Sequence, residues 1–172
     1  MKKEITEIRI YVACIASYNN GILHGRWIDA TCGADHIFLE IADMLKNSPA
    51  YMAEEFSIHD YEGFKDIRLS EYECINQVCD YAEFIEEHGE LGAKLFEHLG
   101  DLDDAKSYLE NNYFGEYKSV ADYAQILTEE TTEIPESLRY YIDYKAMAHD
   151  MEINDVLAIE LRYDEVHIFG RF

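Results

Sequence analysis

The chain has 172 residues, of which 48% are hydrophobic, and its 36 Asp and Glu against 14 Lys and Arg give a formal net charge of −22. This hydrophobic content supports a packed core and excludes a disordered acidic tail. The negative field repels DNA, RNA and anionic membranes and favours a basic protein surface. We therefore expect a folded protein with no nucleic acid and no membrane among its partners.

The negative charge is concentrated in the later part of the chain. Residues 1–50 hold six acids and five bases, which leaves 30 acids and nine bases, or −21, for residues 51–172. Simple solubility and adaptation to high salt are the alternative interpretations. Because salt adaptation is expected to spread acids over the whole chain, the uneven placement favours a partner.

We expect a cytoplasmic protein. The opening residues MKKEITEI become charged before a signal peptide's apolar segment forms, and no apolar run approaches the ~20 residues that cross a bilayer. The four cysteines have no paired short spacing, so we expect reduced thiols, with Cys74 and Cys79 near the buried side of one helix.

Residues 1–66 are predicted to form a small α+β lobe. The pattern predicts strands at 8–16, 23–29 and 56–61 and a helix at 34–46. The Asn20-Gly21 dipeptide is a strong turn signal between the first two strands. Trp27 is expected to fill the core of this lobe.

Residues 67–112 are predicted to form a central, acidic, helical lobe. Ser70 and Glu73 have the spacing of a capping box, which predicts a helix to about His88 that stops at Gly89. Shorter helices are expected at 90–99 and 102–111, the second capped by Asp101. The polar side of the first helix is expected to carry Glu73, Asp80, Glu83 and Glu87.

Residues 113–172 are predicted to form a second α+β lobe. We expect a strand at 113–118, a helix capped by Ser119 to about 130, and a hairpin of strands 156–163 and 166–172. Between them, Pro135 predicts the first turn of a helix that continues to about Asp150. On that helix a column of carboxylates at seven-residue spacing, Glu136, Asp143 and Asp150, would flank two apolar faces, which is more apolar surface than one core requires.

No motif points to catalysis or to a metal. His88 and His98 lie ten residues apart on different expected helices, and neither a zinc-protease motif nor paired Cys and His ligands occur. We therefore predict a non-enzymatic protein with no catalytic residue, no metal and no cofactor. A carboxylate-based hydrolase is the less favoured alternative, because paired acids can perform acid–base chemistry.

The amount of charge matches a short piece of DNA. Duplex DNA carries one negative charge per ~1.7 Å of axis, so 22 charges correspond to roughly 37 Å of duplex. Acids seven residues apart on a helix are separated by about 10.5 Å. One such column is too sparse to copy a DNA strand, so neighbouring acids must fill in the pattern.

The chain resembles the ArdA-type antirestriction proteins carried by mobile genetic elements. The features that carry the resemblance, in chain order, are Tyr18-Asn19-Asn20-Gly21 with Gly25 and Trp27, Ile58-His59-Asp60-Tyr61-Glu62, Glu129-Glu130-Thr131, Ile134-Pro135, Ser137-Leu138 and Tyr141-Ile142-Asp143-Tyr144. They span most of the chain, and the Tyr-Ile-Asp-Tyr segment is the most specific of them. Residues 65–117 are similar only in acidity and helical character.

The resemblance implies an elongated, three-lobed α+β chain that forms a homodimer and mimics bent DNA. The implied partner is the DNA-binding groove of type I restriction-modification enzymes, formed by the methyltransferase and specificity subunits. Partner-binding carboxylates are then expected at Glu73, Asp80, Glu83, Glu87, Glu129, Glu130, Glu133, Glu136, Asp143 and Asp150. Dimer contacts are expected in the C-terminal lobe at Leu138, Tyr140, Tyr141 and Tyr144. An acidic adaptor for another basic DNA-binding protein is the alternative function.

Overall fold

The computed structural model describes residues 7–171, which form an α+β fold with two small antiparallel sheets of three strands each. The strands are β1 (Arg9–Cys14), β2 (Gly25–Asp29), β3 (Phe56–Glu62), β4 (Tyr113–Tyr117), β5 (Val156–Arg162) and β6 (Glu165–Gly170). The helices are α1 (Ile15–Asn19), α2 (Ala34–Lys46), α3 (Ile75–Leu99), α4 (Leu102–Asn111), α5 (Val120–Thr131) and α6 (Tyr144–Asn154). The chain divides into two compact units, one up to Ala93 and one from Lys94 onward. The three-lobed division at 66/67 and 112/113 stays a prediction.

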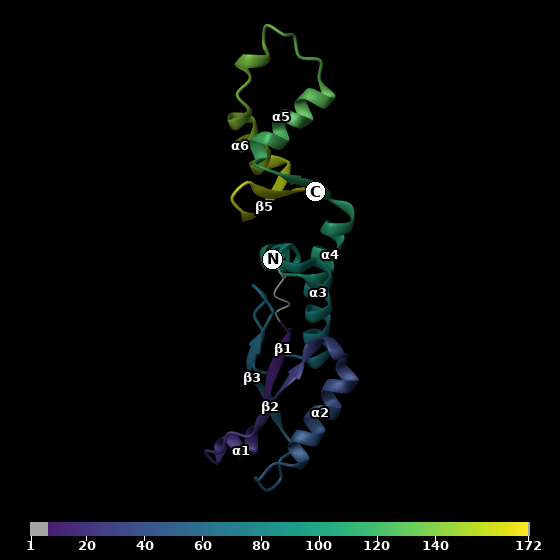
Figure 1. Ribbon diagram of the computed structural model, residues 1–172, viewed down its shortest axis with the longest axis vertical. Coiled ribbons are helices and arrows are strands. Elements are labelled where there is room, and N and C mark those ends of the chain that lie inside the picture. The colour runs from purple at the N-terminus through teal and green to yellow at the C-terminus, as the bar shows by residue number, and fades with distance from the viewer. Residues whose placement is uncertain (1–6, 172) are drawn as a thin grey trace. The chain divides into compact units, whose positions relative to one another are not determined.

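The first unit is built on a sheet of order β2-β1-β3, with α2 alongside it (Figure 1). Central strand β1 contributes Ile10 and Val12, which are completely buried, and α2 contributes Ile37 and Met44 to the buried core. The three predicted strands and the predicted helix are therefore confirmed, with small changes at their ends. Alternating and helical apolar spacing predicted them because each pattern describes one buried face.

Trp27 does not fill the core, contrary to expectation. Its side chain is 36% exposed, whereas the next residue, Ile28, is only 4% exposed. Successive side chains on a strand point to opposite faces, so burying Ile28 turns Trp27 outward. There its ring packs edge-on against Tyr11, and the Arg9 guanidinium lies 4.8 Å from the ring centroid.

Helix α3 begins later than the capping box predicts. The Glu73 carboxylate accepts a hydrogen bond from the Ser70 backbone N–H at 3.1 Å, but both residues lie in a turn and the helix starts at Ile75. Cys74 is consequently exposed rather than near a buried helix face. The predicted interruption at Gly89 is confirmed, since that residue has a non-helical φ of 60° and ψ of −139° inside α3.

The second unit is built on a sheet of order β4-β6-β5. Helices α5 and α6 pack together against it around a core that includes Val120, Ala148 and Ile168. As predicted, the Ser119 hydroxyl caps α5 by accepting a hydrogen bond from the Asp122 N–H at 3.1 Å. The predicted C-terminal hairpin is also confirmed, with Asp164 at a φ of 59° in its turn.

The predicted helix from Pro135 to Asp150 is wrong in its first half. Two successive turns occupy this stretch, in which the Leu138 N–H donates to the Pro135 carbonyl and the Tyr141 N–H donates to the Leu138 carbonyl, each at 2.9 Å. Helix α6 begins only at Tyr144, because the Asp143 carboxylate caps it by accepting hydrogen bonds from the Lys145 and Ala146 N–H groups. A short helical segment gains most of its stability from packing. The side chains of this stretch are mostly exposed and supply little packing.

No helix within residues 7–171 is both long and apolar enough to cross a membrane.

Candidate functional site: an acidic and aromatic surface

Helix α3 presents carboxylates opposite its buried side. Val78 and Ala82 are fully buried, whereas Asp80, Glu83 and Glu87 are exposed on the same helix. Asp80 and Glu87 are seven residues apart within regular helix, so their separation along the axis is about 10.5 Å. This part of the predicted column is correct.

Glu73 does not continue that column. It precedes the first residue of α3, is half-buried, and uses its carboxylate to accept a hydrogen bond from Ser70. Of the four acids expected on the central helix, three are thus placed on it and displayed to solvent.

The second group of carboxylates lies at the end of α5, in the connection that follows, and on α6. Glu129 and Glu130 are exposed in the last turn of α5, and Glu133 and Glu136 are exposed in residues 132–143. Figure 1 shows this connection as a loop that projects beyond the ends of α5 and α6. The acids are therefore displayed on a protruding segment.

The expected column of Glu136, Asp143 and Asp150 is wrong. Only Asp150 lies within α6, while Asp143 is its N-cap and Glu136 lies in a turn. The cause is the late start of α6, which removes the regular rise that a seven-residue column requires. All three carboxylates are exposed, but they do not form a straight row.

Few basic side chains neutralise the ten candidate acids. Within residues 7–171, no lysine or arginine forms an ion pair with any of them, and Glu87 lies 3.7 Å from His88 Nε2. By contrast, Arg26 of the first unit holds both Glu40 and Asp43 at 2.8 and 2.9 Å. The candidate acids thus retain their charge for a cationic partner.

The expected dimer contacts lie in the same protruding loop and at the start of α6. Leu138, Tyr140 and Tyr141 are 55%, 89% and 84% exposed. Tyr144 is half-buried, and its buried hydroxyl has no hydrogen-bond partner among residues 7–171. Large apolar side chains gathered at this level of exposure are typical of a surface that another molecule covers.

A cleft in the second unit has a volume of about 550 Å³ and is lined by residues that include Ser119, Lys145, Glu152 and Glu160. The Ser119 hydroxyl is engaged as the helix cap of α5, so it is not poised as a nucleophile.

In the first unit, hydrogen bonds from the Thr31 backbone N–H and hydroxyl lower the pKa of Asp29. A general acid requires a raised pKa instead.

The structure also brings together three residues that the sequence analysis did not connect. Glu116 on β4 and Glu165 and His167 on β6 lie side by side. A Glu-x-His pattern on one strand is a weak signal alone. Its significance appears only when the register of β4 against β6 is known.

Comparison with known protein families places the chain. No curated protein matches it significantly. The family model described as "Antirestriction protein (ArdA)" matches residues 10–165. This match covers nearly the whole chain and all fourteen candidate residues, so the chain belongs to the ArdA family of antirestriction proteins.

Proposed function

We propose that this antirestriction protein is a non-enzymatic mimic of DNA that occupies the DNA-binding groove of a type I restriction-modification enzyme. The observation that carries the proposal is the display of nine exposed acids, without lysine or arginine partners in residues 7–171, on α3 and on the α5–α6 region. Because the chain belongs to an antirestriction family, the partner proposed for these acids is a restriction-modification enzyme.

The mechanism follows from the electrostatics of DNA-binding grooves. Such grooves present lysine and arginine to phosphates, and binding is driven largely by the release of condensed counterions. A protein with a net charge of −22 meets the same groove with fixed carboxylates. The groove formed by the methyltransferase and specificity subunits is then blocked, so restriction stops and modification stops with it.

The protein acts as a homodimer in this proposal. The contact between the two copies is formed by the exposed side chains of Leu138, Tyr140 and Tyr141 together with the half-buried Tyr144. Two copies double the length of duplex that the charge can match, from roughly 37 Å to roughly 75 Å at one charge per ~1.7 Å. The protein itself binds no nucleic acid and no membrane, because its field repels both.

Competition kinetics test this function. A purified type I restriction-modification enzyme is assayed for cleavage and for methylation at several concentrations of its target DNA, with increasing amounts of this protein. A DNA mimic predicts inhibition that is relieved as target DNA is raised. Inhibition independent of DNA concentration, or none at stoichiometric excess, would contradict the proposal and favour an acidic adaptor for a different basic protein.

A further inference from the structure

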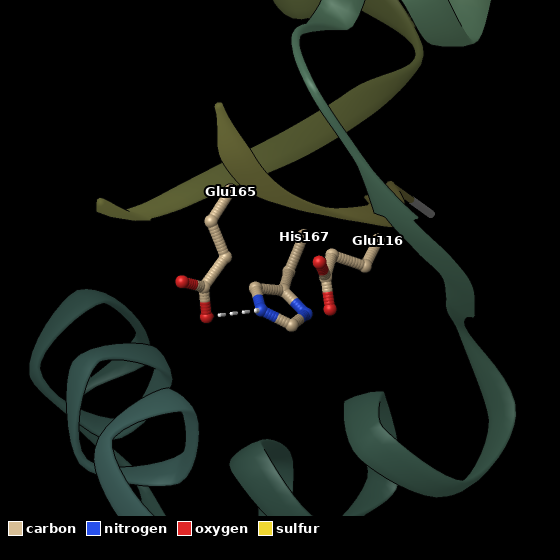
Figure 2. Close-up of side chains that lie close together, drawn as sticks. All are labelled: Glu116, Glu165 and His167. Carbon is tan, nitrogen blue, oxygen red and sulfur yellow. Dashed lines mark ion pairs between the residues drawn. The ribbon is translucent and has the colours of Figure 1, made fainter. Parts of the chain in front are cut away.

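Three potential metal ligands meet on one face of the second sheet. In the register of β4 against β6, Glu116 lies directly opposite His167, and Glu165 precedes His167 by two residues on β6. Residues that pair across strands, and residues two apart along a strand, share a face. A carboxylate oxygen of each glutamate and a ring nitrogen of His167 accordingly all lie within 4.8 Å of one another (Figure 2).

His167 supplies an independent indication that a ligand binds here. Its side chain is more than nine-tenths buried, and its Nε2 atom has no hydrogen-bond partner within residues 7–171. This nitrogen lies 3.8 Å from Glu165 Oε1, which is beyond hydrogen-bonding distance (Figure 2). Buried polar atoms without partners are uncommon in folded proteins, and a bound ion is one of the explanations for them.

The other ring nitrogen of His167 is held in place. Its Nδ1 atom lies 2.7 Å from the Tyr113 hydroxyl, and the two rings stack with centroids 5.8 Å apart. When Nδ1–H donates to that hydroxyl, Nε2 keeps its lone pair on the side of the ring that faces Glu165 (Figure 2). A hydrogen bond of this kind behind a metal-binding histidine orients the ring and sets its tautomer.

We propose that Glu116, Glu165 and His167 form a binding site for a divalent transition-metal ion of the Zn²⁺ class. One imidazole and two carboxylates suit Zn²⁺, whereas Mg²⁺ prefers six oxygen ligands. Tetrahedral Zn²⁺ with bonds of about 2.1 Å places its ligand atoms about 3.4 Å apart, so the metal draws the three groups inward. Glu116 is exposed and free to rotate, while Arg162 Nη1 holds Glu165 Oε2 at 3.2 Å and leaves Oε1 toward the site.

The test is an isothermal calorimetric titration with Zn²⁺. The protein is first treated with a chelator, and the titration is made in a large excess of Mg²⁺. The Mg²⁺ occupies the many exposed acids that bind cations weakly. We expect one saturable Zn²⁺ site per chain. The change Glu116→Gln should weaken it at least tenfold, and Tyr113→Phe should weaken it by about 10- to 100-fold through loss of the hydrogen bond behind His167.

Glu160→Gln is the matched control. Glu160 is exposed on the same sheet but pairs with Val166, so it lies on the opposite face from His167. The control should bind Zn²⁺ like the unaltered protein, and Co²⁺ should give a d–d absorption spectrum that Glu116→Gln removes and Glu160→Gln retains. Since Glu116 is exposed, its substitution does not threaten folding. No saturable site, or equal Zn²⁺ affinity in the Glu116→Gln and Glu160→Gln variants, would overturn the proposal whatever the antirestriction activity.

Discussion

The decoy mechanism predicts that inhibition depends on where charge is removed and not only on how much. The sequence offers two adjacent pairs of exposed glutamates, Glu129 with Glu130 and Glu54 with Glu55. The first pair lies in the last turn of α5 and belongs to the nine exposed acids proposed to bind the enzyme, whereas the second pair directly precedes β3 and does not belong to them. Changing either pair to glutamine removes the same two negative charges, so the variants differ only in the position of the change.

The size of the effect follows from the exposure of these carboxylates. An exposed ion pair contributes about 0.2–1 kcal/mol, because solvent and salt screen it. Two lost contacts with a basic groove therefore cost about 0.4–2 kcal/mol, or roughly 2- to 30-fold in inhibition constant. A single change such as Glu136→Ala should cost no more than about fivefold and leave most inhibition intact.

The assay is the inhibition constant for cleavage by a purified type I enzyme at fixed DNA and salt. We expect the Glu129/Glu130 variant to be weaker and the Glu54/Glu55 variant to be close to the unaltered protein. Two results would refute this reasoning. Equal losses for both pairs would show that total charge alone matters, and complete loss from Glu136→Ala would show that one contact dominates.

Three further changes test the dimer and the fold. Leu138→Asp places a charge among exposed apolar side chains of the proposed dimer contact. Sedimentation should then show monomers, while the circular dichroism spectrum stays unchanged. An intact dimer would contradict that contact. Ser119→Ala removes the α5 cap and should lower the free energy of unfolding by about 1 kcal/mol in urea titrations, whereas Ser137→Ala, in an exposed turn, should not. Gly63→Ala should lower the free energy of unfolding more than Gly21→Ala does, again in urea titrations. Both glycines have φ near +80°, but a Cβ at Gly63 would lie 2.5 Å from the Glu7 carbonyl oxygen, whereas one at Gly21 would have no neighbour within 4 Å. Equal losses for the two glycine variants would exclude that steric clash as the cause.

The elements that could be predicted from the sequence are those set by short-range signals. Ser119 and Asp101 each cap a helix by bonding to N–H groups two or three residues away, and both were recognisable without the structure. The strands of the first sheet were recognisable because alternation records burial on one face. The exposure of the candidate acids followed from charge alone, since unpaired carboxylates are rarely buried.

The errors arose where a local signal competed with longer-range packing. Pro135 suits the first turn of a helix, but Asp143 caps a helix that begins at Tyr144, nine residues later. The exposed stretch between them has little to pack against. Likewise, Trp27 points to solvent because its neighbour Ile28 occupies the buried face of β2. The first outcome combines a competing local cap at Asp143 with a lack of packing partners, and the second depends on which face of β2 the fold buries.

The cluster of Glu116, Glu165 and His167 shows a different limit. Its members come from strands separated by about fifty residues of chain, and only the pairing of Glu116 with His167 brings them together. A search for metal motifs examines spacing along the sequence, so it finds ligands on one helix or one loop more readily than ligands on paired strands. Strand register is set by the whole unit.

The central claim is that this protein takes the place of DNA on the enzyme. The most direct measurement is displacement of labelled target DNA from a purified type I methyltransferase core by this protein, repeated across a series of salt concentrations. A DNA mimic predicts displacement at low salt, with an affinity that falls steeply as salt rises, because screening weakens attraction between exposed charges. Failure to bind the core or to displace DNA even at low salt would contradict the claim and leave the acidic adaptor as the better account.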